Sequence, residues 1–169
     1  WSIRAIDDWI EWSGRRPRKE AVASACRVLA KRYRGQELIM MVTKVLNIPA
    51  HYNNDAIQDQ LDEDSDVSAY TYEKAVYTES INALHKNGLY EEADQLYAEG
   101  VASGHLPWAV MPSSGGGGEH KQLRLDLHGM SAAVAHSAVR VSLEKEIMGP
   151  AQMAQPGDNI RARDVMIVT

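Results

Sequence analysis

Asp126 and His128 are the residues of this chain whose types and spacing best suit catalysis. They lie in the run Leu123-Arg-Leu-Asp-Leu-His-Gly-Met-Ser131, where apolar and polar residues alternate as in a half-buried strand. The alternation places the three leucines on one face and Arg124, Asp126 and His128 on the other. A carboxylate and an imidazole on one exposed face can act as general acid and base, because imidazole titrates near neutral pH.

Two chemical roles for Asp126 follow from its carboxylate, and a structural alternative stays open beside them. The carboxylate can orient the imidazole of His128, or it can hold a divalent cation such as Mg²⁺. Alternatively, Asp126 accepts backbone N–H bonds of a turn, Gly129 supplies a positive φ, and Ser131 caps the helix that follows. The strand, the turn and the helix cap are expected under either interpretation.

Helical periodicity dominates the first half of the chain. The spacing of apolar residues predicts a hairpin of two helices, over Arg18–Tyr33 and Gln36–Asn47. Gly35 is expected to break the first of these helices, and Pro49 to end the second. A further helix is predicted within residues 1–13.

A second helical hairpin is predicted before Pro107. Apolar residues recur at helical spacing on both sides of a turn at Gly88, and Gly104 is expected to cap the return helix. The apolar residues are Tyr77, Ile81 and Leu84, then Ala93, Leu96, Tyr97 and Val101. Between the hairpins, residues 51–73 contain an acidic run and are expected to form a loop.

The last third of the chain is predicted to be a tether followed by an α/β unit. Residues 109–121 contain four consecutive glycines and are expected to be a flexible linker. Ser131 is expected to cap a helix over Ala132–Met148, and residues 164–169 are expected to be a buried strand. The apolar side of that helix is predicted to consist of Ala135, Val139, Leu143 and Ile147. Strand, helix and strand make a βαβ unit with a parallel pair, which is incomplete because two strands do not form a stable sheet.

Charge is distributed unevenly in a chain whose net charge is −5. Residues 1–50 carry ten Lys and Arg against five Asp and Glu, whereas residues 51–107 carry two against twelve. The basic first part suits a phosphate backbone, and the acidic middle should repel one. No apolar run is long enough to span a bilayer, and no targeting segment is visible. Cys26 is the single cysteine, so it is expected in the core, and no zinc-ligand spacing is present.

The second hairpin resembles a pentatricopeptide repeat, the helical hairpin of organellar RNA-binding proteins. The resemblance covers residues 74–108 and lies in Tyr77, Ile81, Ala83, Leu84, Lys86, Gly88, Glu91, Glu92, Ala93, Leu96, Tyr97, Gly104 and Pro107. The rival is a tetratricopeptide repeat, which binds proteins. In that repeat the turn glycine and the second-helix alanine lie about twelve residues apart, whereas Gly88 and Ala93 are five apart. Under this resemblance, residues 1–50 hold a degenerate copy of the repeat.

The resemblance implies that Thr78 and Trp108 occupy the two positions with which such a repeat reads one base. A threonine hydroxyl can donate and accept a hydrogen bond at a base edge. Tryptophan does not suit base discrimination, although it can stack on a base, and we expect it to pack against the following domain. A basic helix face adds a further candidate surface for RNA, with the chain's own acidic loop as the alternative partner. This face consists of Arg27, Lys31 and Arg34.

The tail resembles the Smr domain, a small nucleic-acid-binding and often nucleolytic α/β module. Asp126-Leu-His128-Gly129 matches its first motif, and Ala132, Ala135 and Val139 suit its first helix. Its second motif, Thr-Gly-x-Gly, would begin at Thr169. We therefore expect a C-terminal fragment of a longer protein, inactive by itself as a nuclease. The resemblance implies that Arg124 and Gly129 contact the nucleic acid.

Together the two resemblances imply α-helical hairpin repeats, arranged as an α-solenoid, followed by an incomplete α/β Smr domain over residues 122–169. The implied function is binding and processing of single-stranded RNA in a chloroplast or mitochondrion. Cleavage would be carried by Asp126 and His128, with Mg²⁺ as the candidate cofactor. DNA is a second candidate ligand, and no membrane contact is expected. Two alternatives stay open: a non-catalytic RNA-binding factor for transcript stabilisation or translation, and a scaffold whose helical hairpins dock a protein partner.

Overall fold

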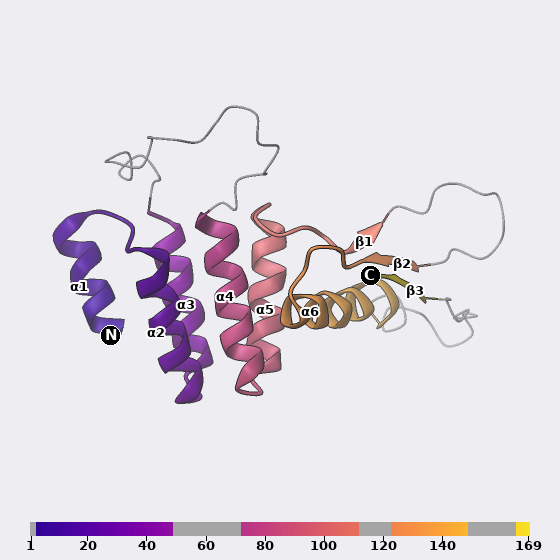
Figure 1. The fold of residues 1–169 in the computed structure, drawn as a ribbon, viewed down its shortest axis with the longest axis horizontal. Coiled ribbons are helices and arrows are strands. Elements are labelled where there is room, and N and C mark those ends of the chain that lie inside the picture. The colour runs from indigo at the N-terminus through magenta and orange to yellow at the C-terminus, as the bar shows by residue number, and fades with distance from the viewer. Residues whose placement is uncertain (1–2, 49–71, 112–122, 149–164) are drawn as a thin grey trace, which may run out of the picture.

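The computed structural model describes residues 3–48, 72–111, 123–148 and 165–169. These residues are mostly helical, with a small three-stranded sheet. The elements are α1 (Ile3–Ser13), α2 (Lys19–Lys31), α3 (Gly35–Leu46), α4 (Tyr72–Lys86), α5 (Tyr90–Ala102), β1 (Val110–Met111), β2 (Leu123–Asp126), α6 (Ala132–Leu143) and β3 (Val165–Val168). Figure 1 shows α1 at one end, followed by the pair α2 and α3 and the pair α4 and α5, with α6 and the sheet at the other end. α2 packs against α4, and α3 packs against α4 and α5.

The first predicted hairpin is formed by α2 and α3, but its turn differs from the prediction. Gly35 does not break α2, because it is the first residue of α3, and Tyr33 instead takes the left-handed backbone with a φ of 56°. Gly35 is buried, and a Cβ added there would lie 2.7 Å from the Glu92 side chain of α5. The glycine therefore permits close packing between the hairpins. Cys26 lies in the core as predicted, where burial raises the pKa of its thiol to about 11.

The helix predicted within residues 1–13 is α1, which flanks the first hairpin. Ile6 is buried and Ile10 is half-buried against the core. Lys44 of α3 donates to the Asp7 carboxylate at 2.7 Å, and this ion pair ties α1 to the hairpin. Trp12 lies on the exposed side of the helix.

The second predicted hairpin is formed by α4 and α5, and its turn is at Gly88, as predicted, with a φ of 75°. The predicted apolar residues Tyr77, Ile81 and Leu96 are buried. The hydroxyl of buried Tyr97 donates to the Pro107 carbonyl at 2.9 Å, so the chain that leaves α5 folds back against the hairpin.

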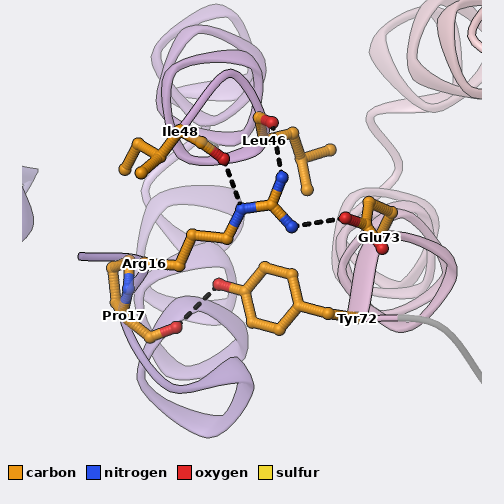
Figure 2. Close-up of polar contacts among 6 residues, drawn as sticks. All are labelled: Arg16, Pro17, Leu46, Ile48, Tyr72 and Glu73. Atoms are coloured by element: carbon orange, nitrogen blue, oxygen red, sulfur yellow. Dashed lines mark hydrogen bonds and ion pairs between the residues drawn. The ribbon is translucent and has the colours of Figure 1, made fainter. Parts of the chain in front are cut away.

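Arg16 fastens the first hairpin to the second, as Figure 2 shows. Its side chain is only 7% exposed. Nε donates to the Ile48 carbonyl at 2.6 Å, and Nη2 donates to the Leu46 carbonyl at 3.0 Å. Nη1 binds the carboxylate of Glu73, and the guanidinium lies 5.4 Å from the ring centroid of Tyr72. This Arg16 clip therefore joins the C-terminal end of α3 to the first turn of α4.

The strands form one sheet in the order β1-β2-β3. β2 and β3 are parallel, with Leu125 opposite Ile167 and Asp126 opposite Val168, which confirms the predicted parallel pair. β1 is antiparallel to β2, with Val110 opposite Leu125.

Two predictions for this region are wrong. The linker is predicted from residue 109, but Ala109 is buried and residues 110–111 form β1. The chain is held there because the Ala109 carbonyl accepts the backbone N–H of Asp126 at 2.8 Å. Residues 112–121 of the predicted linker lie outside the described residues. The last strand is predicted to be buried, but Val165, Met166 and Ile167 are 39%, 42% and 51% exposed, since β3 is the edge strand of the described sheet.

Ser131 begins α6 as predicted, because its hydroxyl accepts the Val134 N–H at 3.4 Å. The helix is shorter than predicted, since a π-helical turn over Glu144–Met148 follows it. Its buried face also differs from the prediction. The buried apolar residues are Ala133, Val134, Ala138 and Val141, whereas Ala135, Val139 and Leu143 are half-buried. This face packs on α4 and α5, so the hairpins and the βαβ unit share one core.

Two further predictions concern the chain as a whole. The predicted acidic loop over residues 51–73 lies outside the described residues, except for its last two residues, which begin α4. Within the described ranges, no helix has both the length and the apolar content that crossing a membrane requires.

Candidate functional site

The side chains of Asp126 and His128 are in contact at the end of β2. Asp126 Oδ1 lies 2.7 Å from His128 Nδ1, and the same oxygen accepts the backbone N–H of His128 at 3.0 Å. The His128 side chain is 62% exposed and that of Asp126 is 39% exposed. The predicted placement of both residues on an exposed face is therefore confirmed, and the two side chains form an acid–base pair open to a ligand.

The chain around this pair also has the features of the structural alternative. The bond from the His128 N–H to the Asp126 carboxylate closes a turn, and Gly129 has a φ of 70°. The backbone and side-chain hydrogen bonds from His128 lower the pKa of Asp126 below its ordinary value, so this carboxylate is ionised at neutral pH. The ionised carboxylate of Asp126 accepts the backbone N–H of the turn and also contacts the imidazole, so the turn and the acid–base pair coexist.

The other residues predicted for this end of the sheet are exposed. Arg124 precedes the pair on β2, and Gly129 follows it in the turn. Among the residues that the structure places, no group of three or more His, Cys, Asp or Glu side chains is arranged to hold a metal ion. Asp126 is the carboxylate that this motif can offer to Mg²⁺, a cation that commonly keeps several waters and takes other ligands from a substrate phosphate.

A groove runs between α2 and α4. It consists of two adjoining hollows that share Arg27 and Glu79, and we name it the α2–α4 groove. Its lining residues are Lys19, Glu20, Ala23, Arg27 and Lys31 on α2, with Ala75, Thr78, Glu79, Asn82, Ala83, Lys86 and Asn87 along α4 and its end. Four cationic side chains thus face two anionic ones, so the groove is positively charged in a chain whose net charge is −5. Such a groove attracts an anionic strand.

The structure separates the three residues of the predicted basic face. Arg27 and Lys31 line the α2–α4 groove. The guanidinium of Arg27 lies 3.4 Å from the Glu79 carboxylate in an exposed ion pair that crosses the groove. Arg34 lies beyond the end of α2, where it is paired with Glu37, and it is not among the groove residues.

The structure also separates the two predicted base-reading residues. Thr78 is half-buried and lines the α2–α4 groove, where its hydroxyl can meet a ligand. Trp108 is half-buried at the edge of the core, and the Lys145 ammonium lies 5.2 Å from its ring centroid. Trp108 therefore packs against the C-terminal unit, as we expect from the sequence, and it is not among the groove residues.

A cluster of rings at the junction of α4, α5 and α6 has no signal in the sequence. The His85 and His136 ring centroids are 4.8 Å apart, and the His85 ring lies 4.9 Å from that of Tyr90. Beside them, Arg140 Nε donates to the Asp94 carboxylate at 2.6 Å. His85 Nε2 is buried and has no hydrogen-bond partner within the part of the chain that the structure describes. Burial, followed by the neighbouring His136, lowers the pKa of His85 below its ordinary value.

We expect the folded chain to lose stability through His85 as the pH falls below about 6.5, the ordinary pKa of histidine. Because the folded-state pKa is lowered, the unfolded chain binds more protons in this range, and the stabilisation present above the ordinary pKa is lost below it. Phenylalanine at this position keeps the ring contacts with Tyr90 and His136 and removes the titration. The drop in Tm across this range should therefore be smaller for His85→Phe than for the wild type, and an equal drop would contradict the prediction.

Comparisons with known proteins give no relative of this chain. No protein-family model matches it, and no curated protein and no solved structure matches it. The resemblances to a pentatricopeptide repeat and to the Smr domain therefore rest only on the sequence motifs given above.

Proposed function

We propose that this chain binds single-stranded RNA in the α2–α4 groove and presents it to Asp126 and His128 for processing. The groove is the observation that carries the proposal. It is positively charged and lined by the hydroxyl of Thr78 and the amide of Asn82, which can bond to base edges. In this proposal, α2 to α5 are repeats of the pentatricopeptide type and the βαβ unit belongs to an Smr domain. The packing of α2 on α4 and of α3 on α5 supports that arrangement.

In this proposal, each polar atom of the acid–base pair has a role. Asp126 Oδ1 faces His128 Nδ1, so the tautomer protonated at Nδ1 is favoured and Nε2 is left to accept or donate a proton at the substrate. Arg124 would contact a phosphate beside the pair. If Mg²⁺ binds, Asp126 Oδ2 would hold it together with phosphate oxygens, and the cation would stabilise charge on the phosphate. If no Mg²⁺ binds, the role of Asp126 is to orient the imidazole of His128.

Replacing both Lys31 and Lys86 by alanine should weaken binding of single-stranded RNA by roughly tenfold, because each lysine neutralises a phosphate. The dependence of log K on log salt concentration should fall by about 0.7 for each lysine removed. Glu79→Gln should strengthen binding severalfold, since it removes a negative charge from the groove and releases Arg27. Fluorescence anisotropy of a labelled oligonucleotide, measured over a salt series, gives all three quantities.

Arg34→Ala is the matched control for this experiment. Arg34 follows the same basic helix but lies outside the groove and is paired with Glu37, so its loss should leave the affinity unchanged. Equal losses for Arg34→Ala and the double lysine variant would place the binding surface elsewhere. A flat response to salt would remove phosphate contact from the proposal, and absence of binding would favour the protein-interaction scaffold.

A further inference from the structure

Asn82 belongs to two parts of the molecule at once. It lines the α2–α4 groove one helical turn beyond Thr78, on the side of α4 that also carries Lys86. Its side-chain carbonyl Oδ1 also accepts the hydroxyl of Ser131 at 2.9 Å. The amide N–H groups of Asn82 remain as donors for a ligand in the groove.

Ser131 belongs to the turn that carries the acid–base pair. It is three residues beyond His128, and its hydroxyl is the N-cap of α6. The Met130 N–H donates to the Leu127 carbonyl at 3.2 Å, which keeps the intervening turn tight. Ser131 therefore lies within about 11 Å of His128, because three residues span no more than that distance.

We propose that Asn82 is a positioning residue that couples the α2–α4 groove to the Asp126–His128 pair. Its amide N–H groups contact a nucleic-acid strand in the groove, and its carbonyl holds Ser131 and the turn in register with that strand. The proposal rests on the proposed function of the groove and adds a physical link between the groove and the acid–base pair. A strand bound along α4 contacts Thr78, Asn82 and Lys86. Because Asn82 also bonds to Ser131, binding of the strand changes the surroundings of the His128 imidazole.

The coupling can be tested by NMR of the isotope-labelled chain titrated with a short single-stranded oligouridine. The amide signals of Thr78 and Lys86 report on the groove, and those of His128 and Ser131 report on the turn. In the wild type, both sets should shift together along the titration. In Ser131→Ala, the groove signals should still shift, while the His128 shift should fall severalfold. Ser131→Thr keeps the hydroxyl and should restore it.

Asn87 supplies a matched control for Asn82. Both asparagines line the groove, but the Asn87 amide donates to the Ala83 carbonyl at 2.8 Å instead of reaching α6. Asn87→Ala should leave the His128 response intact, whereas Asn82→Ala should abolish it.

Groove signals that shift without any shift at His128 in the wild type would overturn the coupling and leave RNA binding standing. A His128 response that persists in full in Ser131→Ala would overturn it too. Groove signals that do not move would refute both the proposed function and the coupling.

Discussion

Replacing Arg16 by alanine is expected to lower the free energy of unfolding by about 3–5 kcal/mol, the usual cost of breaking a buried ion pair by removing one partner. The Arg16 side chain is 7% exposed and pairs with the Glu73 carboxylate. It also donates hydrogen bonds to the backbone carbonyls of Leu46 and Ile48. Glu73 is itself only 17% exposed. Without the guanidinium, a nearly buried carboxylate and two carbonyl groups at the end of α3 lose their donor at once.

The pKa of Glu73 shows how strongly Arg16 acts on it. Burial by itself would raise the pKa of this carboxyl group, but the hydrogen bond and the charge of Arg16 outweigh burial, with help from a backbone N–H, and the pKa is lowered. The clip is reinforced on its other side, where the Tyr72 hydroxyl donates to the Pro17 carbonyl at 2.7 Å (Figure 2). Lysine cannot replace the planar fork of donors, so Arg16→Lys should recover only a small part of the stability.

Arg27→Ala is the control for Arg16→Ala, because it also removes an arginine that pairs with a glutamate on α4. The Arg27–Glu79 pair is 67% and 48% exposed and 3.4 Å long, so its loss should cost less than about 1 kcal/mol. Urea titration of both variants gives the two free energies. Equal costs would show that the Arg16 clip is no more than a surface contact.

The elements that could be predicted from the sequence are those that local periodicity and turn residues define. The hairpin around Gly88 is one of them, since its apolar residues repeat at helical spacing and glycine supplies the turn. The strand before His128 is another, because alternation sorts its side chains onto two faces. In both cases the deciding interactions lie within a few residues of one another along the chain.

Other features depend on residues that only the fold brings together. The acceptors of Arg16 lie 30 to 57 positions further along the chain, and no spacing rule connects them. The buried face of α6 differs from the predicted one because its partners, α4 and α5, decide which side is covered. β1 has two residues, too few for alternation to mark a strand. The α2–α4 groove and the contact between His85 and His136 likewise require the relative placement of separate helices.

Under the proposed function, replacing His128 by alanine in the full-length protein is expected to reduce RNA cleavage by about 10²- to 10⁴-fold, the usual contribution of a general acid or base. Binding should stay unchanged, because His128 is not among the residues that line the α2–α4 groove. Cleavage of a labelled single-stranded RNA, with and without Mg²⁺, and anisotropy of the same RNA measure the two effects separately.

His128 tests the chemistry more cleanly than Asp126 does. Asp126 accepts the backbone N–H of the turn, so its removal disturbs the fold and the acid–base pair together. The His128 ring is 62% exposed and bonds to Asp126 through Nδ1, so removing it leaves the backbone bond in place. Asp126→Asn keeps an acceptor for that backbone bond but loses the charge that orients the imidazole, and its cleavage should fall less than that of His128→Ala. Equal losses of cleavage and binding in His128→Ala would mean that the pair only shapes the turn, and intact cleavage would place the chemistry elsewhere.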